Sequence, residues 1–306
     1  MDGTVLITGA NGSLALEFIS HSLSRYPALT LIGTVRNPST DADVNTAKLQ
    51  RLLSKYPNAK VFIEKLDLAS LADVCVFCGS VISRVEEQKL PQLRAIICNA
   101  FTWSLDNGVK YTLDGYEATF QVSYLAHYLL VLKLLPRLDR KLGRVVMLGS
   151  AAHYPERTNP LSKLVAHWPD DTAELVQPRP HPENENHDRG WQRYGTSKLV
   201  TLEKDPDRTE ITVTAMDPGG IVDSRAHSEQ RSLAKAVFSI SRVILPVLKY
   251  LTSSMRSSSD SAQDLLEVAI GPTVKPAEVT GDERKQEVLW EASRRWTGMH
   301  EGAGVY

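Results

Sequence analysis

Short apolar runs alternate along most of the chain with longer segments in which apolar residues recur every three or four positions. The apolar runs predict strands over Thr4–Thr8, Thr30–Val35, Lys60–Leu66, Ala95–Cys98, Arg144–Leu148 and Ile211–Met216. The periodic segments predict helices over Leu14–Tyr26, Thr46–Tyr56, Leu71–Glu87, Gly115–Leu135 and Glu283–Thr297, and a further helix that begins near Trp191. Strands that alternate with helices are typical of an α/β fold, in which helices cover both faces of a doubly wound parallel sheet.

Two segments interrupt this alternation. Residues 154–193 are polar and rich in proline, histidine and acidic residues, and they are too long for an ordinary connection. We expect them to form a loop insertion on the substrate side, because long loops at the carboxyl ends of parallel strands shape pockets. Residues 228–256 include an apolar, basic stretch that predicts a lid-like helical segment, with peripheral membrane contact as the alternative. We predict one domain over residues 1–306.

Composition excludes several other classes of protein. With 306 residues and a net charge of −1, the chain has the size of one large domain and gives no electrostatic case for nucleic acid. Three cysteines imply no disulfide framework, and the scattered histidines lack metal-ligand spacing, so we predict no metal. No uncharged apolar stretch reaches the roughly 18 residues of a spanning helix. No signal peptide precedes the first strand, so the chain is expected to be cytoplasmic.

A glycine-containing turn follows the first strand and leads into a helix. Its residues are Thr8-Gly9-Ala10-Asn11-Gly12-Ser13-Leu14-Ala15. Glycines permit a tight turn and let the backbone approach a pyrophosphate, which then rests on the helix N-terminus. Followed by a second strand, this turn favours dinucleotide binding on a Rossmann-like fold.

Two side chains farther along the predicted sheet bear on the choice of dinucleotide. Arg36 follows the second strand, where a guanidinium suits the 2′-phosphate of NADP(H) and an acidic residue would suit NAD. A solvated surface arginine is the alternative interpretation. Asp67 follows the third strand and could accept a hydrogen bond from the adenine amino group, or serve as an ordinary helix N-cap.

Tyr194 and Lys198 are spaced to lie on one face of a helix, one turn apart. An ammonium group beside a phenol lowers its pKa, and such a tyrosine can exchange a proton with a carbonyl or alcohol oxygen near neutral pH. This spacing is common by chance, so it gains meaning only together with a cofactor site and a third polar group.

The landmarks taken in order resemble the short-chain dehydrogenase/reductase family. They are Thr8-Gly9-x-x-Gly12, Asp67-Leu68, Asn99-Ala100, Ser150, Tyr194-x-x-x-Lys198 and Pro218-Gly219. Each is weak alone, and their order carries the resemblance. Val-Met-Leu-Gly-Ser-Ala-Ala-His and Met-Asp-Pro-Gly-Gly-Ile-Val-Asp-Ser resemble the retinol-dehydrogenase-like and fungal secondary-metabolism members of the family.

The resemblance implies a role for each matching residue. Tyr194 would be the general acid or base, Lys198 would lower its pKa and hold the nicotinamide ribose, and Ser150 would bind the substrate oxygen. A strand-end serine that only satisfies the backbone is the alternative for Ser150. The residues implied in cofactor binding, besides Tyr194 and Lys198, are Thr8, Gly9, Asn11, Gly12, Ser13, Leu14, Arg36, Asp67, Leu68, Asn99, Ala100, Pro218, Gly219, Ile221 and Ser224.

The chain departs from the family pattern at four places. Ser13 and Ala15 replace glycines of the turn, and we expect the turn to survive because both are small. Ser123 replaces an asparagine that relays protons from the lysine, so it is expected to be a weaker relay at a catalytic position. The helix carrying Lys198 is expected to end at Asp205-Pro206, after about 21 Å, as if an internal piece were missing. The family's last strand is not recognisable between Gly271 and Arg284.

The leading hypothesis is an NADP-dependent reductase of a ketone or aldehyde on an apolar small molecule. A step in secondary-metabolite biosynthesis would fit this reaction. Its partner would be a carbonyl or alcohol substrate, and a homodimer is compatible with the family. Two alternatives stay open. One is an inactive or cofactor-binding remnant, damaged by the short helix. The other is a dehydratase or isomerase that uses the same tyrosine and lysine without net reduction.

Overall fold

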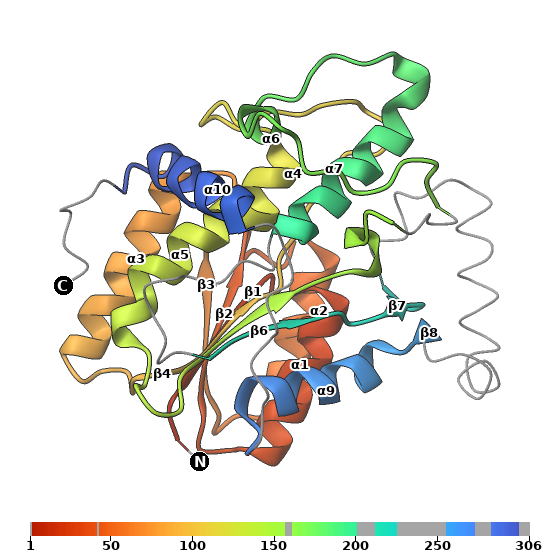
Figure 1. Ribbon diagram of the computed structural model, residues 1–306. Coiled ribbons are helices and arrows are strands. Elements are labelled where there is room, and N and C mark those ends of the chain that lie inside the picture. The colour runs from red at the N-terminus through yellow and green to blue at the C-terminus, as the bar shows by residue number, and fades with distance from the viewer. Residues whose placement is uncertain are drawn as a thin grey trace.

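The computed structural model describes residues 2–41, 43–156, 161–200, 212–224, 255–272 and 283–299. Its centre is a parallel sheet with strand order β3-β2-β1-β4-β5-β6 (Figure 1). The strands are β1 Thr4–Thr8, β2 Thr30–Val35, β3 Lys60–Lys65, β4 Leu93–Cys98, β5 Arg144–Leu148 and β6 Thr212–Met216. The order reverses between β1 and β4, which confirms the doubly wound, Rossmann-like prediction.

Helices cover both faces of the sheet because the strand side chains alternate between two apolar layers. On one face α1 (Ser13–Arg25), α2 (Val44–Leu53) and α9 (Ser258–Ile270) pack on Val5, Ile7 and their counterparts. On the other face α3 (Leu71–Glu86) and α5 (Ala126–Leu134) pack on a second layer that includes Leu6. Burial on both sides explains why β1, β2, β4 and β5 are mostly apolar in sequence, whereas the edge strand β3 has exposed positions and lysines at both ends.

The long helix predicted over Gly115–Leu135 forms as four consecutive pieces. These are α4 (Ala118–Phe120), a π-turn over Gln121–Leu125, α5, and a 3-10 turn over Leu135–Arg137. The stretch Ala118–Arg137 is long and apolar enough by length and composition to cross a membrane, but 72% of its apolar window is buried inside the protein. That burial is typical of the core helix of a globular protein. Helix α10 (Glu283–Trp296) lies over α5. Its Leu289 is buried in a cluster with Phe120, Tyr124 and Tyr128 of the long helix.

Helix α7 (Asn186–Val200) begins five residues before the position predicted from the sequence. The prediction near Trp191 was wrong because the buried face of the first turns consists of His187 and Gly190 rather than apolar residues. Small and polar groups pack there without an apolar period in the sequence. The expected end of this helix near Asp205 lies outside the described residues.

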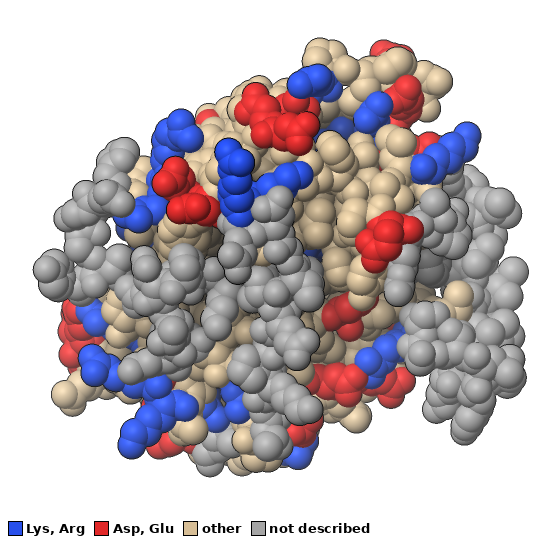
Figure 2. All heavy atoms as spheres, viewed as in Figure 1, with Lys and Arg blue, Asp and Glu red and all other residues tan. Residues whose placement is uncertain are grey.

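The remaining described elements are short. A 3-10 turn Ala151–His153 directly precedes the predicted insertion, and α6 (Ala173–Val176) and a 3-10 turn Glu183–Glu185 lie within it. β7 (Gly220–Ile221) pairs with β8 (Met255–Arg256). Apart from β8, most of the lid-like segment lies outside the described residues, as does most of the stretch where the last strand was sought. On the face shown in Figure 2, the described acidic and basic side chains are interspersed without a large field of one sign.

Candidate active site

The turn after β1 has the geometry of a phosphate-binding turn. Gly9 has φ +66°, and the Gly12 amide donates to the Gly9 carbonyl at 2.9 Å. A Cβ on Gly12 would lie 3.1 Å from that carbonyl oxygen. Gly12 is the N-cap of α1, no side chain caps it, and the first turn contains no acidic residue. The helix N-terminus therefore fits the pyrophosphate of a dinucleotide.

The side chains within this turn brace it. Leu14 and Ala15 are buried against the sheet, and Ser13 is the first residue of α1, so the turn forms despite the two glycine replacements. Asn11 is 7% exposed, and its Nδ2 donates to Asp43 Oδ2 at 2.9 Å. The Asn11 side chain thus ties the turn to α2, which leaves its backbone for the predicted cofactor contact.

The turn after β4 is bonded directly to the turn after β1. Asn99 Nδ2 donates to the Thr8 carbonyl at 2.8 Å and to the Gly9 carbonyl at 3.3 Å. The backbone amides of Asn99 and Ala100 both donate to Thr8 Oγ1 at 3.0 Å. The Asn99 side chain therefore holds the glycine turn in place, a role that the sequence did not indicate.

Arg36, Asp67 and Leu68 follow the carboxyl ends of β2 and β3, at the same edge of the sheet. Arg36 is exposed, directly after Val35. Asp67 accepts a hydrogen bond from the Ala69 amide at 3.0 Å, while Ser70 is the N-cap of α3. The alternative interpretation of Asp67 as the helix cap is therefore wrong. Leu68 is buried.

The structure brings Ser150 and Tyr194 close together. Ser150 follows β5 and caps the 3-10 turn Ala151–His153, where its Oγ accepts the Ala152 amide at 3.2 Å. Tyr194 lies on α7, which packs against this turn, and the Ser150 side chain acts to lower the pKa of its phenol. The close approach depends on glycine, since a Cβ on Gly195 would lie only 2.5 Å from the Ala152 carbonyl oxygen.

Lys198 lies one turn beyond Tyr194 and is 2% exposed. Its Nζ donates to the Leu148 carbonyl at 2.8 Å and lies 5.8 Å from the ring centroids of both Tyr194 and Phe101. Burial lowers the pKa of Lys198 to about 8, because a charged ammonium is poorly stabilised away from water.

The pKa of Tyr194 moves in the opposite direction from the one expected. Burial raises it to about 12, the Ser150 side chain acts to lower it, and the charge of Asp217 raises it further. The expected lowering by Lys198 is not among these effects. Tyr194 is therefore protonated at neutral pH, as a general acid must be.

Ser123 lies in the π-turn and is 1% exposed. Its Oγ has no hydrogen-bond partner among the described residues. A buried hydroxyl without a partner is costly, and π-turns occur often at functional sites. This geometry is compatible with the predicted relay role, which stays a prediction.

The loop after β6 lies beside the Ser150 turn, because the Gly149 amide donates to the Met216 carbonyl at 2.8 Å. In this loop Gly219 has φ +75° and the Pro218 carbonyl accepts a hydrogen bond from Ser261 Oγ at 2.7 Å. Ile221 lies in β7, and the Ser224 amide donates to its carbonyl at 3.2 Å. Their predicted contacts with the cofactor stay predictions.

Three aromatic side chains that the sequence did not single out surround Tyr194. The ring centroids of Phe101, Trp103 and Trp191 lie 5.4, 5.1 and 5.8 Å from that of Tyr194. Phe101 is 38% exposed. The signal for two of them was available, since Phe101 and Trp103 directly follow the Asn99-Ala100 landmark at the end of β4.

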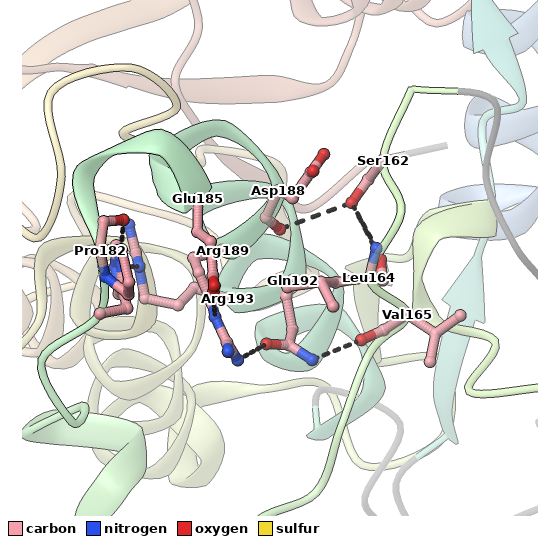
Figure 3. A network of polar contacts seen from close by, with 10 residues as sticks. Ser162, Leu164, Val165, Pro182, Glu185, Asp188, Arg189, Gln192 and Arg193 are labelled. Carbon is pink, nitrogen blue, oxygen red and sulfur yellow. Dashed lines mark hydrogen bonds and ion pairs between the residues drawn. The ribbon is translucent and has the colours of Figure 1, made fainter.

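Polar contacts hold the described part of the predicted insertion against α7 (Figure 3). Gln192 Nε2 donates to the Val165 carbonyl at 2.9 Å, and Arg189 Nε donates to Glu185 Oε2 at 2.8 Å. Arg193 Nε lies 3.3 Å from Glu117 Oε1, whose carboxylate is almost fully buried. The insertion therefore supports the helix that carries Tyr194. No group of three metal-ligating side chains occurs within the described ranges.

Comparisons with known proteins point in one direction. No model of a known protein family matches the chain. The chain is 29% identical to the short-chain dehydrogenase iccH of Talaromyces variabilis, over 98% of this chain and 97% of that protein. It is 32% identical to the short chain dehydrogenase/reductase mfmJ of Annulohypoxylon moriforme, over 50% of this chain and 44% of that protein.

A solved carbonyl reductase from chicken fatty liver, with NADPH bound, has a similar fold. The TM-score is 0.57 at 19% identity, and the match covers 88% of this chain and 87% of that one. The alignment with the Talaromyces protein extends over 374 residues, more than the 306 of this chain. That relative therefore contains internal residues that this chain lacks.

Proposed function

Because the chain belongs to the short-chain dehydrogenase/reductase family, we propose that it is an NADP-dependent reductase of a ketone or aldehyde on an apolar small molecule. The observation that supports this most directly is the close approach of the helix carrying Tyr194 to the turn that Ser150 caps, with Lys198 one helical turn away. These residues follow β5 or lie on α7, at the carboxyl edge of the sheet where the Gly9–Gly12 turn also lies. A dinucleotide and a carbonyl group could therefore meet there.

In the proposed reaction Tyr194 donates its phenolic proton to the carbonyl oxygen, while Ser150 donates a hydrogen bond to the same oxygen. NADPH, when bound, supplies the hydride that adds to the carbonyl carbon. Hydride and proton together convert the carbonyl into an alcohol. Lys198, one helical turn beyond Tyr194, holds the nicotinamide ribose in this proposal. Ser123 relays protons between this site and solvent.

The apolar substrate class is supported by Phe101 and Trp103, which present partly exposed rings beside Tyr194. As part of the proposal, we place the enzyme in the cytoplasm and in secondary-metabolite biosynthesis, and pairing of two copies stays a prediction.

The proposed chemistry is tested by incubating the protein with NADPH deuterated on the transferred hydrogen and a panel of aromatic and aliphatic ketones and aldehydes. We expect consumption of reduced cofactor and an alcohol product that carries the label. A product formed without label would argue instead for dehydration or isomerisation.

Cofactor choice is tested by Arg36→Ala. Loss of a charge-assisted contact with the 2′-phosphate is expected to raise the Kd of NADPH by about tenfold to a hundredfold. The Kd of NADH, which lacks this phosphate, should not change. Arg51→Ala removes an exposed positive charge from α2 and is the matched control. An equal loss of affinity for both cofactors in Arg36→Ala would contradict NADP preference.

A protein that binds NADPH without turnover is the second candidate. The observation that favours it is the internal segment present in the Talaromyces relative and absent here. NADPH binding detected by fluorescence, together with no reduction of any carbonyl in the panel, would select this candidate.

A further inference from the structure

His127 is a fully buried histidine that connects Thr8, at the start of the turn after β1, with Ser123 in the π-turn. It lies on α5 one helical turn after Ser123 and is 0% exposed. Its Nδ1 lies 3.3 Å from the Ser123 carbonyl oxygen, and its Nε2 lies 2.8 Å from Thr8 Oγ1. His127 takes no part in the proposed reaction itself.

The hydrogen bonds fix which ring nitrogen carries the proton. A carbonyl oxygen only accepts, so Nδ1–H must donate to Ser123. Burial lowers the pKa of His127 to about 3, and the positive charge of Lys198 acts in the same direction, so the ring is neutral. In a neutral imidazole the other nitrogen is an acceptor. Nε2 therefore accepts the hydroxyl proton of Thr8.

This arrangement fixes the direction of the Thr8 hydroxyl. The competing acceptor for its proton is the Ile97 carbonyl, at 3.5 Å against 2.8 Å for His127 Nε2. With its proton on His127, Thr8 Oγ1 turns its lone pairs toward the amides of Asn99 and Ala100, both at 3.0 Å. All three hydrogen-bonding positions of this fully buried hydroxyl are then used.

We propose that His127 is a positioning residue that orients the Thr8 hydroxyl and thereby joins the turn after β1 to the turn after β4 in the form that binds the cofactor. This inference rests on the proposed function, because it concerns the affinity of the same site for NADPH. Without the imidazole acceptor, the hydroxyl proton has only the distant Ile97 carbonyl. The positions of the two turns relative to each other are then no longer fixed at the point where Gly9 packs closely against Ala100. A Cβ added to Gly9 would lie only 3.1 Å from the Cβ of Ala100.

The test uses two substitutions, each of which keeps one of the two hydrogen bonds of the His127 ring. His127→Asn retains a donor near Nδ1 for the Ser123 carbonyl but does not reach Thr8. His127→Gln extends to the position of Nε2, where its amide oxygen accepts from Thr8. We expect the Kd of NADPH, measured by fluorescence, to rise about tenfold in His127→Asn, since a buried hydroxyl is left without its acceptor. In His127→Gln the Kd should rise only about twofold to threefold, because the hydrogen bond from Thr8, whose loss costs about tenfold in Kd, is kept.

Thr8→Val tests the same hydrogen bond from the other side with a side chain of matching shape. We expect Thr8→Val to raise the Kd of NADPH at least as much as His127→Asn does. The Kd of the double variant should be no higher than that of Thr8→Val alone, because both substitutions remove the same hydrogen bond. Val81→Ala, a core change in α3 outside the turn, controls for loss of stability. It should lower the Tm and leave the Kd unchanged.

Equal Kd values for the Asn and Gln variants, or independent effects in the double variant, would overturn the proposal and leave a merely structural histidine. The readout is separate from turnover. If the wild-type protein binds NADPH but reduces no carbonyl, the proposed function fails and the Kd pattern still decides the role of His127. If the wild-type protein does not bind NADPH, both proposals are overturned.

Discussion

Tyr194→Phe is expected to lower the kcat of carbonyl reduction by about a hundredfold to ten-thousandfold, the range that one positioned acid contributes. The substitution removes the proposed proton donor and its interaction with Ser150 but keeps the ring. The contacts of that ring with Phe101 and Trp103 depend on its shape and should persist. The Kd of NADPH should therefore stay within about twofold of the wild-type value, far less than the tenfold that loss of one hydrogen bond gives.

The measurement is single-turnover reduction of the best substrate in the panel, with fluorescence titration of NADPH beside it. Tyr56→Phe is the matched control, because its hydroxyl is bonded to Ser24 at 2.8 Å, on the α1–α2 side of the sheet away from α7. Full retention of kcat in Tyr194→Phe would exclude Tyr194 as the general acid. Loss of cofactor binding in proportion to kcat would assign it a structural role instead.

Gly195→Ala is expected to cost about a hundredfold in kcat without altering any group that reacts. The added Cβ would lie 2.5 Å from the Ala152 carbonyl oxygen, so α7 must move away from the turn that Ser150 caps. A displacement of about 1 Å between reacting groups suffices for a loss of that size. Overpacking should also lower the free energy of unfolding by about 1–3 kcal/mol.

Gly79→Ala is the control, because it makes the same change in an exposed part of α3 where no atom lies within 4 Å of the new Cβ. It should leave kcat unchanged and raise the free energy of unfolding by about 0.5–1 kcal/mol, since alanine favours helix over glycine. Denaturant unfolding and kcat measured on both variants separate the two effects. Wild-type kcat in Gly195→Ala would show that the approach of α7 to Ser150 is not required.

Strands β1, β2, β4 and β5 were predictable because burial on both faces makes each of them a mostly apolar run. The start of α7 was not, because its buried face uses His187, Gly190 and Gly195 in place of an apolar stripe. Glycines at a close contact carry no hydrophobic signal, although they decide how near Tyr194 comes to Ser150.

The candidate site was predictable as a set of landmarks but not as a network. Motif spacing pointed to Ser150, Tyr194 and Lys198, and the structure places the helix of Tyr194 against the turn that Ser150 caps. The rise in the pKa of Tyr194 depends on how completely the fold buries it, which spacing cannot show. His127 was missed because a single histidine in an apolar helix gives no indication of the Thr8 hydroxyl that it contacts 119 positions away.

The bonds between the turns after β1 and β4 also bear on the order of folding. In sequence the glycine turn looks like a local motif that the first strand and helix complete by themselves. Yet the Asn99 amide that holds Thr8 comes from 91 residues later in the chain. Contacts of such separation form late, after the cost of closing the intervening loop has been met. A chain emerging from the ribosome would therefore complete the turn after β1 only when β4 joins the sheet. The proposed binding of NADPH would then require four assembled strands rather than one.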